Sequence, residues 1–279
     1  MKNFIRYFFS ILLMISCLML FAMVAYKTLF VEEGSGNMPP VDGTQTEEVG
    51  GQPGGENGDD KNETAQPEVP VEPVAPVKPD PNAAPFTTAD ASYFADALFI
   101  GDSRTVGLKE YGQIEGADFF CTTGMNVYKV RDEVVNVGSV GSVTLDQLLS
   151  AKTYGKIYLM LGINELGYNM DQTIGKYKEV VDWLREKSPQ SIIFIQANLH
   201  VAAARSNSDA TFNNARINQF NAAISEFIDN EKIFYIDANS LFDDENGDLR
   251  ADYTSDNTHI YAKYYVDWKN WMLTKAIAV

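Results

Sequence analysis

Five short apolar runs alternate with longer amphipathic stretches between Ala89 and Val279, and this alternation limits the fold more than any other feature. The runs are ALFIG at 97–101, ADFFC at 117–121, KIYLML at 156–161, SIIFIQA at 191–197 and KIFYID at 232–237. Four of them have the length and composition of a buried parallel strand, and the run at 117–121 is a weaker match.

Helices are predicted between these runs, where apolar residues recur every three or four positions. The stretches with this spacing are 145–149, 174–184, 212–227 and 261–277. A chain that alternates strand and helix in this way favours a doubly wound parallel sheet with helices on both faces. We therefore expect an α/β fold.

Polar residues follow four of the predicted strands. They are Ser103 after the first, 122–124 after the second, 162–165 after the third and 198–200 after the fourth. Ligands of open α/β sheets bind outside the carboxyl ends of the strands. Neither a G-x-G-x-x-G motif nor a phosphate-binding Walker loop occurs in the sequence. We expect a site built around Ser103 at one edge of the sheet.

A serine becomes a nucleophile beside a base that takes its proton, and the base needs a third group to orient it. The chain has two histidines. His259 directly precedes the last predicted helix, and Asp256 lies three residues ahead of it, close enough to accept a hydrogen bond from the ring. His200 has no carboxylate close by in sequence, since the nearest is Asp209. The sequence therefore predicts a triad of Ser103, His259 and Asp256.

These residues resemble four sequence blocks of the SGNH (GDSL) hydrolases. The blocks are Gly101–Ser103, a glycine after the second strand, Gly162–Asn164 and Asp256–His259, in that order along the chain. The resemblance covers 89–279. It implies a three-layer α/β/α fold with a five-stranded parallel sheet in flavodoxin-like order, and ester or acyl-transfer chemistry on lipids, carbohydrates or small acyl esters.

The resemblance also implies roles for single residues. Ser103 would be the nucleophile, His259 the general base and Asp256 its orienting carboxylate. The backbone N–H groups of Ser103 and Gly124, with the side-chain amide of Asn164, would form the oxyanion hole, the group of donors that stabilises a developing negative oxygen.

Two blocks depart from the commoner family pattern, and both departures affect the substrate. The first reads GDSRT instead of GDSLS, so that Arg104 lies beside the nucleophile, and the third reads GINE, with Glu165 where many members have aspartate. We assign Arg104 and His200 as substrate-binding residues, and Arg104 suits an anionic substrate. A solvated or salt-bridged surface arginine is the alternative for Arg104.

The first 30 residues predict a membrane anchor with a short cytoplasmic tail. Residues 7–26 carry no charge and are long enough to span a bilayer as a helix, and Lys2 and Arg6 precede them. Positive charge at that end favours a cytoplasmic N-terminus and an extracellular domain. A cleaved signal peptide would have a shorter apolar core and a small-x-small site. A lipoprotein cysteine at Cys17 lacks a matching box before it.

Residues 31–88 predict a disordered acidic linker rich in Pro and Gly. Twelve Asp and Glu against two Lys give this segment most of the net charge of −16. The exported part has no basic patch, so nucleic acid is not an expected partner.

The globular domain is expected over 89–279, without an internal disulfide. Cys121 has no partner there, since the other cysteine lies in the anchor, and its apolar context predicts a buried thiol. We expect no cofactor and no metal, because two histidines are too few for the usual site. The acidic stretch 243–248 lacks the spacing of a calcium loop and is expected to form a surface turn.

The function expected from the sequence is an extracellular serine esterase, anchored in the cell membrane, that hydrolyses or transfers O-acyl groups. Acetyl groups on cell-wall polysaccharide or peptidoglycan are the expected substrates, because a tethered domain reaches only what lies near the membrane. A lipase or lysophospholipase is an alternative, although no long apolar loop stands out as a lid. The second alternative is a catalytically inactive envelope-binding module, which would not need the triad residues.

Overall fold

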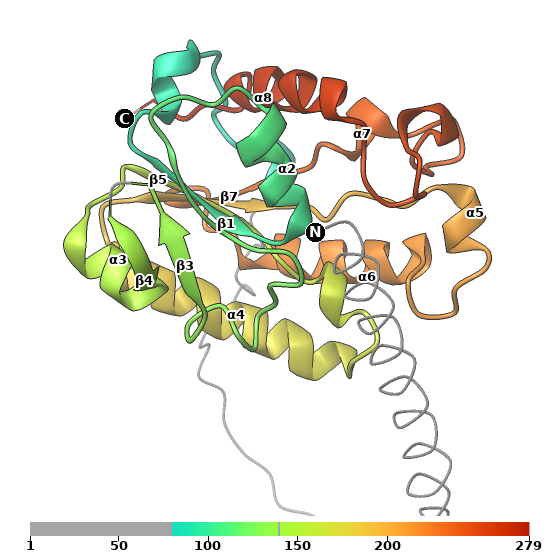
Figure 1. Ribbon diagram of the computed structural model, residues 1–279, viewed down its shortest axis with the longest axis horizontal. Helices are drawn as coiled ribbons and strands as arrows, with labels where there is room; N and C mark the ends of the chain where they lie inside the picture. The colour runs from blue at the N-terminus through green and yellow to red at the C-terminus, as the bar shows by residue number, and fades with distance from the viewer. Residues whose placement is uncertain (1–79, 139, 279) are drawn as a thin grey trace, which may run out of the picture. The chain divides into compact units, whose positions relative to one another are not determined.

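A five-stranded parallel sheet lies at the centre of the computed structural model, which describes residues 80–138 and 140–278 (Figure 1). The strand order is β2-β1-β5-β6-β7, and every neighbouring pair is parallel. The strands are β1 (Ala97–Gly101), β2 (Asp118–Cys121), β5 (Lys156–Met160), β6 (Ile192–Gln196) and β7 (Ile233–Ile236). Each corresponds to one of the five apolar runs, so the predicted strands and their flavodoxin-like order are confirmed.

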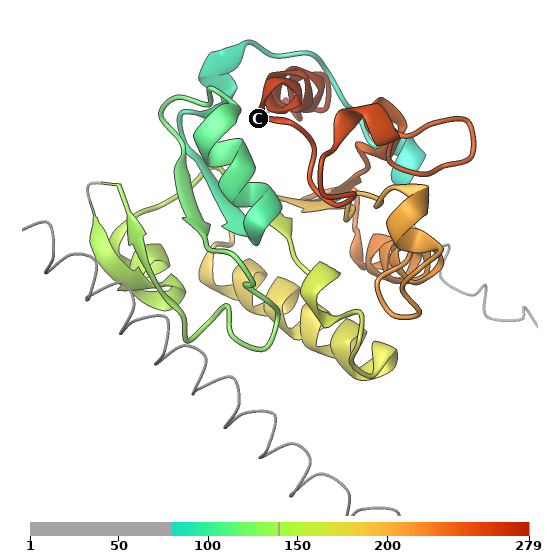
Figure 2. The ribbon, with the colours of Figure 1, turned by 45° about the vertical axis from the view of Figure 1, so that its right-hand side comes forward.

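Helices cover both faces of the sheet, which confirms the three-layer α/β/α architecture (Figures 1 and 2). The helices on one face are α2 (Ser103–Tyr111), α7 (Asn239–Phe242) and α8 (Tyr265–Leu273). Those on the other are α3 (Leu145–Ala151), α4 (Met170–Lys187) and α6 (Asn214–Ile224), and the short α5 (Ala203–Ser206) follows β6. Short 3-10 helices span Pro81–Ala83, Ala91–Phe94, Ile163–Glu165, Ser225–Phe227, Ala251–Tyr253 and Ala262–Tyr264.

The sheet separates two apolar cores, because successive side chains of a strand point to opposite faces. Leu98 and Ile100 of β1 pack in the core beneath α3, α4 and α6. Phe99 packs in the core beneath α2 and α8. In that second core four aromatic rings stack across the sheet, with centroids 4.6–4.9 Å apart: Phe119, Phe99, Tyr158 and Phe194. These residues are register partners on neighbouring strands, so the stack connects four strands of the sheet.

An antiparallel hairpin was not predicted from the sequence. It consists of β3 (Val134–Val137) and β4 (Gly141–Thr144) and lies between β2 and α3 in the chain. Only alternate residues of β3, Val135 and Val137, are buried. A strand with one exposed face has no continuous apolar run, which is why the search for such runs missed it.

The predicted boundary between linker and domain at residue 88 is corrected by the structure. Thr87 forms an antiparallel bridge with Ala276, and the ring of Phe86 packs against Phe234 of β7 at 6.2 Å between centroids. Composition alone placed these residues in the linker because prolines surround them. Residues 31–79 of the predicted linker and the whole predicted anchor lie outside the described residues. In 80–138 and 140–278, no helix has the length and apolar character needed to cross a membrane.

Candidate active site

Ser103 lies at the sharp turn where β1 ends and α2 begins, at the carboxyl edge of the sheet. Asp102 caps the helix, since its Oδ1 accepts the backbone N–H of Arg104 at 2.9 Å. A side chain at Gly101 would collide with Thr105 and with the carbonyl of Met160. The glycine therefore lets α2 start close against the sheet, which brings Ser103 to its rim.

Ser103, His259 and Asp256 form one continuous chain of hydrogen bonds. The Oγ of Ser103 lies 2.9 Å from Nε2 of His259, and Nδ1 of His259 lies 2.7 Å from Oδ2 of Asp256. The side chains of His259 and Asp256 are 38% and 52% exposed, so the site is open to solvent. The structure thus brings together the three residues that the sequence predicted as a triad.

The carboxylate of Asp256 also organises the loop that carries it. Its Oδ1 accepts the backbone N–H groups of Thr258 and His259 at 2.9 and 2.8 Å. Partial burial works to raise the pKa of Asp256, but hydrogen bonds from His259 and Thr258 outweigh it and hold this pKa below its usual range. Asp256 is therefore ionised whenever His259 needs an acceptor.

Two neighbouring segments hold this loop from outside. The carbonyl of Asn257 accepts the backbone N–H of Ala202 at 2.9 Å, from the segment that follows β6. The carbonyl of Thr258 accepts a hydrogen bond from Nη2 of Arg104 at 3.4 Å. The position of His259 is therefore coupled both to α2 and to the end of β6.

The predicted oxyanion donors come from three adjacent strand ends, because β2 and β5 flank β1 in the sheet. Gly124 occupies a tight turn after β2, closed by a 3.1 Å bond from the Met125 N–H to the Thr122 carbonyl, and its φ of 79° suits glycine. Asn164 lies in the 3-10 turn after β5, and its Nδ2 donates to the carbonyl of Met125 at 2.9 Å. An amide nitrogen has two hydrogens, so one remains for a ligand.

Glu165 is a buried acid next to these donors, with 1% of its surface exposed. Its Oε1 accepts the backbone N–H of Val127 at 2.7 Å and so ties the loop after β5 to the loop after β2. Burial raises the pKa of Glu165 to about 7. Its departure from the family block was visible in the sequence, but its linking role was not.

The predicted substrate contact of Arg104 is wrong. The side chain is 2% exposed, because the first turn of α2 directs it into the interior. Burial lowers the pKa of Arg104 and raises the pKa of the fully buried Asp102. The two groups carry opposite charges, so the attraction between them makes both of these pKa shifts smaller. The alternative of a solvated surface arginine is also excluded.

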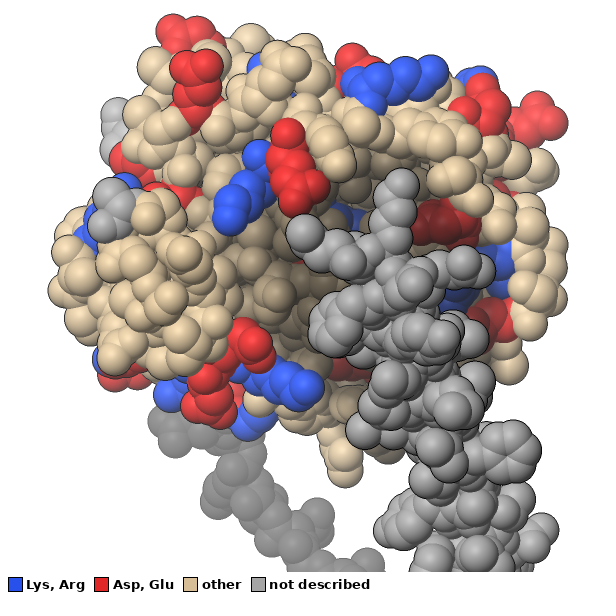
Figure 3. All heavy atoms as spheres, viewed as in Figure 1, with Lys and Arg blue, Asp and Glu red and all other residues tan. Residues whose placement is uncertain are grey.

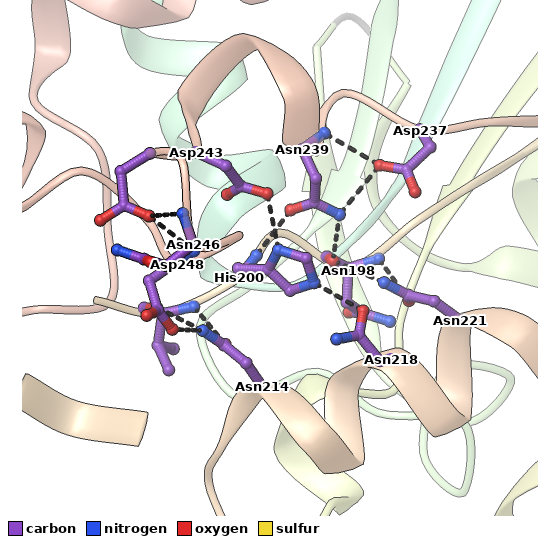
Figure 4. Close-up of polar contacts among 12 residues, drawn as sticks. Asn198, His200, Asn214, Asn218, Asn221, Asp237, Asn239, Asp243, Asn246 and Asp248 are labelled. Atoms are coloured by element: carbon purple, nitrogen blue, oxygen red, sulfur yellow. Dashed lines mark hydrogen bonds and ion pairs between the residues drawn. The ribbon is translucent and has the colours of Figure 1, made fainter. Parts of the chain in front are cut away.

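The predicted substrate contact of His200 is wrong for a similar reason. The residue is 8% exposed, and Figure 4 shows its ring held between Asp243 and Asn218. Nδ1 lies 2.8 Å from Asp243 Oδ2 and Nε2 lies 2.8 Å from Asn218 Oδ1, so both ring nitrogens are engaged. Burial works to lower the pKa of His200, but Asp243 and Asn218 outweigh it and raise it above its ordinary value. The sequence did not indicate Asp243 as a partner of His200, because the two residues lie far apart along the chain.

The remaining candidates are placed as follows. Asp244 closes the turn at 243–248, accepting the backbone N–H groups of Asn246 and Asp248 at 2.8 and 3.2 Å. Cys121 is a free buried thiol whose pKa burial raises to about 12, so it is a poor nucleophile. No group of three or more His, Cys, Asp or Glu side chains in the described part of the chain is placed to hold a metal ion.

Comparison with known families assigns the class of protein. Residues 99–265 match the GDSL-like lipase/acylhydrolase family, and the chain belongs to it. The matched region runs from β1 to the first residue of α8 and so includes all three triad candidates. The chain is therefore a member of the GDSL-like lipase/acylhydrolase class.

Several solved structures are similar to this chain. A GDSL-like lipase from Bacteroides thetaiotaomicron is 16% identical, with a TM-score of 0.49 over 68% of this chain and 93% of that chain. An acetyl xylan esterase is 17% identical, with a TM-score of 0.44 over 65% and 99%. A carbohydrate esterase family 3 protein from Talaromyces cellulolyticus is 15% identical, with a TM-score of 0.43 over 65% and 99%. No curated protein matches the sequence.

Proposed function

We propose that this member of the GDSL-like family is a serine esterase whose catalytic residues are Ser103, His259 and Asp256. The observation that carries the proposal is the hydrogen-bonded order of the three side chains, with the serine on one ring nitrogen of His259 and the carboxylate on the other. That order gives the serine a base and gives the base a fixed tautomer.

The reaction follows from this geometry. Ser103 Oγ attacks the acyl carbonyl while His259 Nε2 takes its proton, and Asp256 stabilises the imidazolium that forms. The carbonyl oxygen becomes negative and receives hydrogen bonds from the N–H groups of Ser103 and Gly124 and from the Asn164 amide. Collapse of this intermediate expels the alcohol, which takes the proton from His259 and leaves the acyl group on Ser103. Water then releases the acid, or a second hydroxyl takes the acyl group.

The substrate that we propose is an O-acyl group, chiefly O-acetyl, on cell-envelope carbohydrate outside the membrane. The open position of His259 and Asp256 supports it, because an ester on a polymer must approach without passing through a narrow channel. The charge pattern of residues 1–30 and the composition of 31–88 support an anchored, extracellular domain. Hydrolysis is the favoured direction, and transfer would need a separate acyl donor.

The test uses the full-length protein with p-nitrophenyl acetate. Ser103→Ala, His259→Ala and Asp256→Asn should each lower kcat/KM at least about a thousandfold. Ser150→Ala is the matched control, because this exposed serine lies on α3, and it should stay within about twofold of wild type.

Three results would contradict the proposal. Activity that persists in Ser103→Ala would exclude this serine as the nucleophile. Activity that rises steeply from acetate to octanoate esters would favour a lipase. A wild-type protein without activity on any of these esters would favour a binding module.

A further inference from the structure

Two exposed tyrosines flank the candidate oxyanion donors. Tyr128 is 38% exposed and follows Gly124 by four residues, and Tyr168 is 57% exposed and follows Asn164 by four residues. Four residues of chain reach at most about 14 Å, so both tyrosines lie near the site. Their rings are in contact, with centroids 5.5 Å apart at an angle of 47°. The two loops thus present a single aromatic surface within about 14 Å of the candidate oxyanion donors.

This surface is held in place before any ligand arrives. The hydroxyl of Tyr128 lies 3.1 Å from Oγ1 of Thr173 on α4. The backbone N–H of Tyr168 donates to the carbonyl of Glu165 at 2.8 Å, and its carbonyl accepts from Arg216 of α6 at 3.4 Å. The ring of Tyr128 is thus held through its hydroxyl, and the ring of Tyr168 is carried on a hydrogen-bonded backbone and packs against Tyr128. Such ordering before binding lowers the conformational entropy that a stacking ligand must remove.

A pocket of about 510 Å³ continues from Tyr128 between the segment leading into β3 and helix α4. It combines the ring of Trp183 with ionisable groups of both signs. One pair of these groups neutralises itself, since Lys176 Nζ lies 2.6 Å from Glu179 Oε2. The guanidinium of Arg131 keeps its charge and lies 4.9 Å from the centroid of the Trp183 ring. Acidic and basic side chains lie side by side over this part of the surface (Figure 3).

This composition distinguishes between ligand classes. A long acyl chain would gain little beside so many charged groups, because their desolvation is costly. A strongly charged ligand would meet groups of both signs. A neutral sugar ring has an apolar face for stacking and hydroxyl groups that both donate and accept hydrogen bonds, so it suits both parts of the surface.

We propose that Tyr128, Tyr168 and the adjoining pocket form a subsite for a neutral glycan, binding the sugar units next to the one whose ester lies at Ser103. The inference rests on the proposed esterase function and specifies its substrate class. It makes Tyr168, the more exposed ring, the main stacking partner.

The experiment compares two substrates on the full-length protein: p-nitrophenyl acetate, which has no glycan, and an acetylated neutral xylo-oligosaccharide. Tyr168→Ala should raise KM for the oligosaccharide about tenfold with little change in kcat, and leave p-nitrophenyl acetate hydrolysis within about twofold. Tyr128→Phe keeps the ring and should change KM less than Tyr128→Ala does. Tyr111→Ala removes a tyrosine from the far end of α2 whose exposure, 46%, lies between those of Tyr128 and Tyr168, and it serves as the control.

Two results in Tyr168→Ala would overturn the subsite. One is an equal loss of kcat/KM on p-nitrophenyl acetate and on the oligosaccharide, and the other is an unchanged KM for the oligosaccharide. A parallel assay uses p-nitrophenyl octanoate, which has a long acyl chain and no glycan. A rise in KM for this ester in Tyr168→Ala, without a rise for the oligosaccharide, would show that the rings bind acyl chains and would also overturn the subsite. If the wild type hydrolyses neither substrate, the proposed function fails while the subsite stays testable. Calorimetric titration of Ser103→Ala with the unacetylated oligosaccharide should then show binding that Tyr168→Ala weakens about tenfold, and absence of binding would refute it.

Discussion

Removing the buried charge of Arg104 should destabilise the domain, and the loss should depend on Asp102. Both side chains are almost fully buried at the start of α2, where Arg104 is 2% exposed and the capping residue Asp102 is 0% exposed. Each charge lowers the cost of burying the other, because their interaction opposes both pKa shifts. Arg104→Met leaves Asp102 as an uncompensated buried carboxylate.

The expected loss of unfolding free energy follows from the burial of both charges. Leaving one member of a buried salt bridge alone costs about 3–5 kcal/mol of unfolding free energy. This range is an upper bound for Arg104→Met, because the attraction between Arg104 and Asp102 only partly offsets the cost of burying them. Asp102 can escape part of this cost by taking up a proton. A carboxyl whose pKa is raised in the folded state loses stability as pH rises from its unfolded pKa to its folded one. Arg104→Met raises the folded pKa of Asp102 further, so the loss should be larger at pH 8 than at pH 5.

A double-mutant cycle in urea, measured at both pH values on the full-length protein, tests this reasoning. Asp102→Asn removes the charge, and an asparagine there still caps α2. In the Arg104→Met background, Asp102→Asn should therefore recover about 1–3 kcal/mol of unfolding free energy. Two results would refute the coupling between Arg104 and Asp102. One is that the stability losses of the two single variants add up to that of the double variant within about 0.5 kcal/mol. The other is a loss from Arg104→Met that is equal at pH 5 and pH 8.

Three further results are expected from the described geometry. Glu165→Gln should gain stability relative to wild type as pH rises from about 4.5 to about 7, because a carboxyl with a raised pKa loses stability over that interval. Urea midpoints of both proteins at pH 5 and pH 8 check this, and a difference between them that is the same at both pH values would contradict it. His200→Gln should lower stability most below about pH 6.5 and less as pH rises through the raised pKa of His200, because the charged ring pairs with Asp243. Thermal melts across this range check it, and a difference between variant and wild type that does not change with pH would contradict it. A chain that begins at Ala89 should be about 1–2 kcal/mol less stable than one that begins at Asp80, because it lacks the bridge to the C-terminal segment and the aromatic contact with β7; equal urea midpoints would show that these contacts add nothing.

The sequence predicted the parts of the fold that depend on continuous patterns. A strand buried on both faces must be apolar throughout, so the five strands of the sheet were visible as runs. Asp256 and His259 were recognisable because they lie three residues apart, and the structure joins them through a local turn. The hairpin β3–β4 buries only alternate residues and therefore has no such run.

Burial of charged residues could not be predicted in the same way. The position of Arg104 next to Ser103 suggested a substrate contact, but the direction of its side chain depends on how α2 packs against the sheet. The partners of His200 come from α6 and from the segment after α7, which only the tertiary fold brings together (Figure 4). Local sequence shows which residues carry charge, and long-range packing decides which of them reach solvent.

The central claim is that Ser103 is the nucleophile and that His259 activates it. The most direct measurement treats the full-length protein with a fluorophosphonate at neutral pH and locates the adduct by peptide mass spectrometry. The account predicts a single adduct on Ser103 that is lost or strongly slowed in His259→Ala. An adduct on another serine, no adduct at all, or labelling of Ser103 that His259→Ala leaves at the wild-type rate would contradict it.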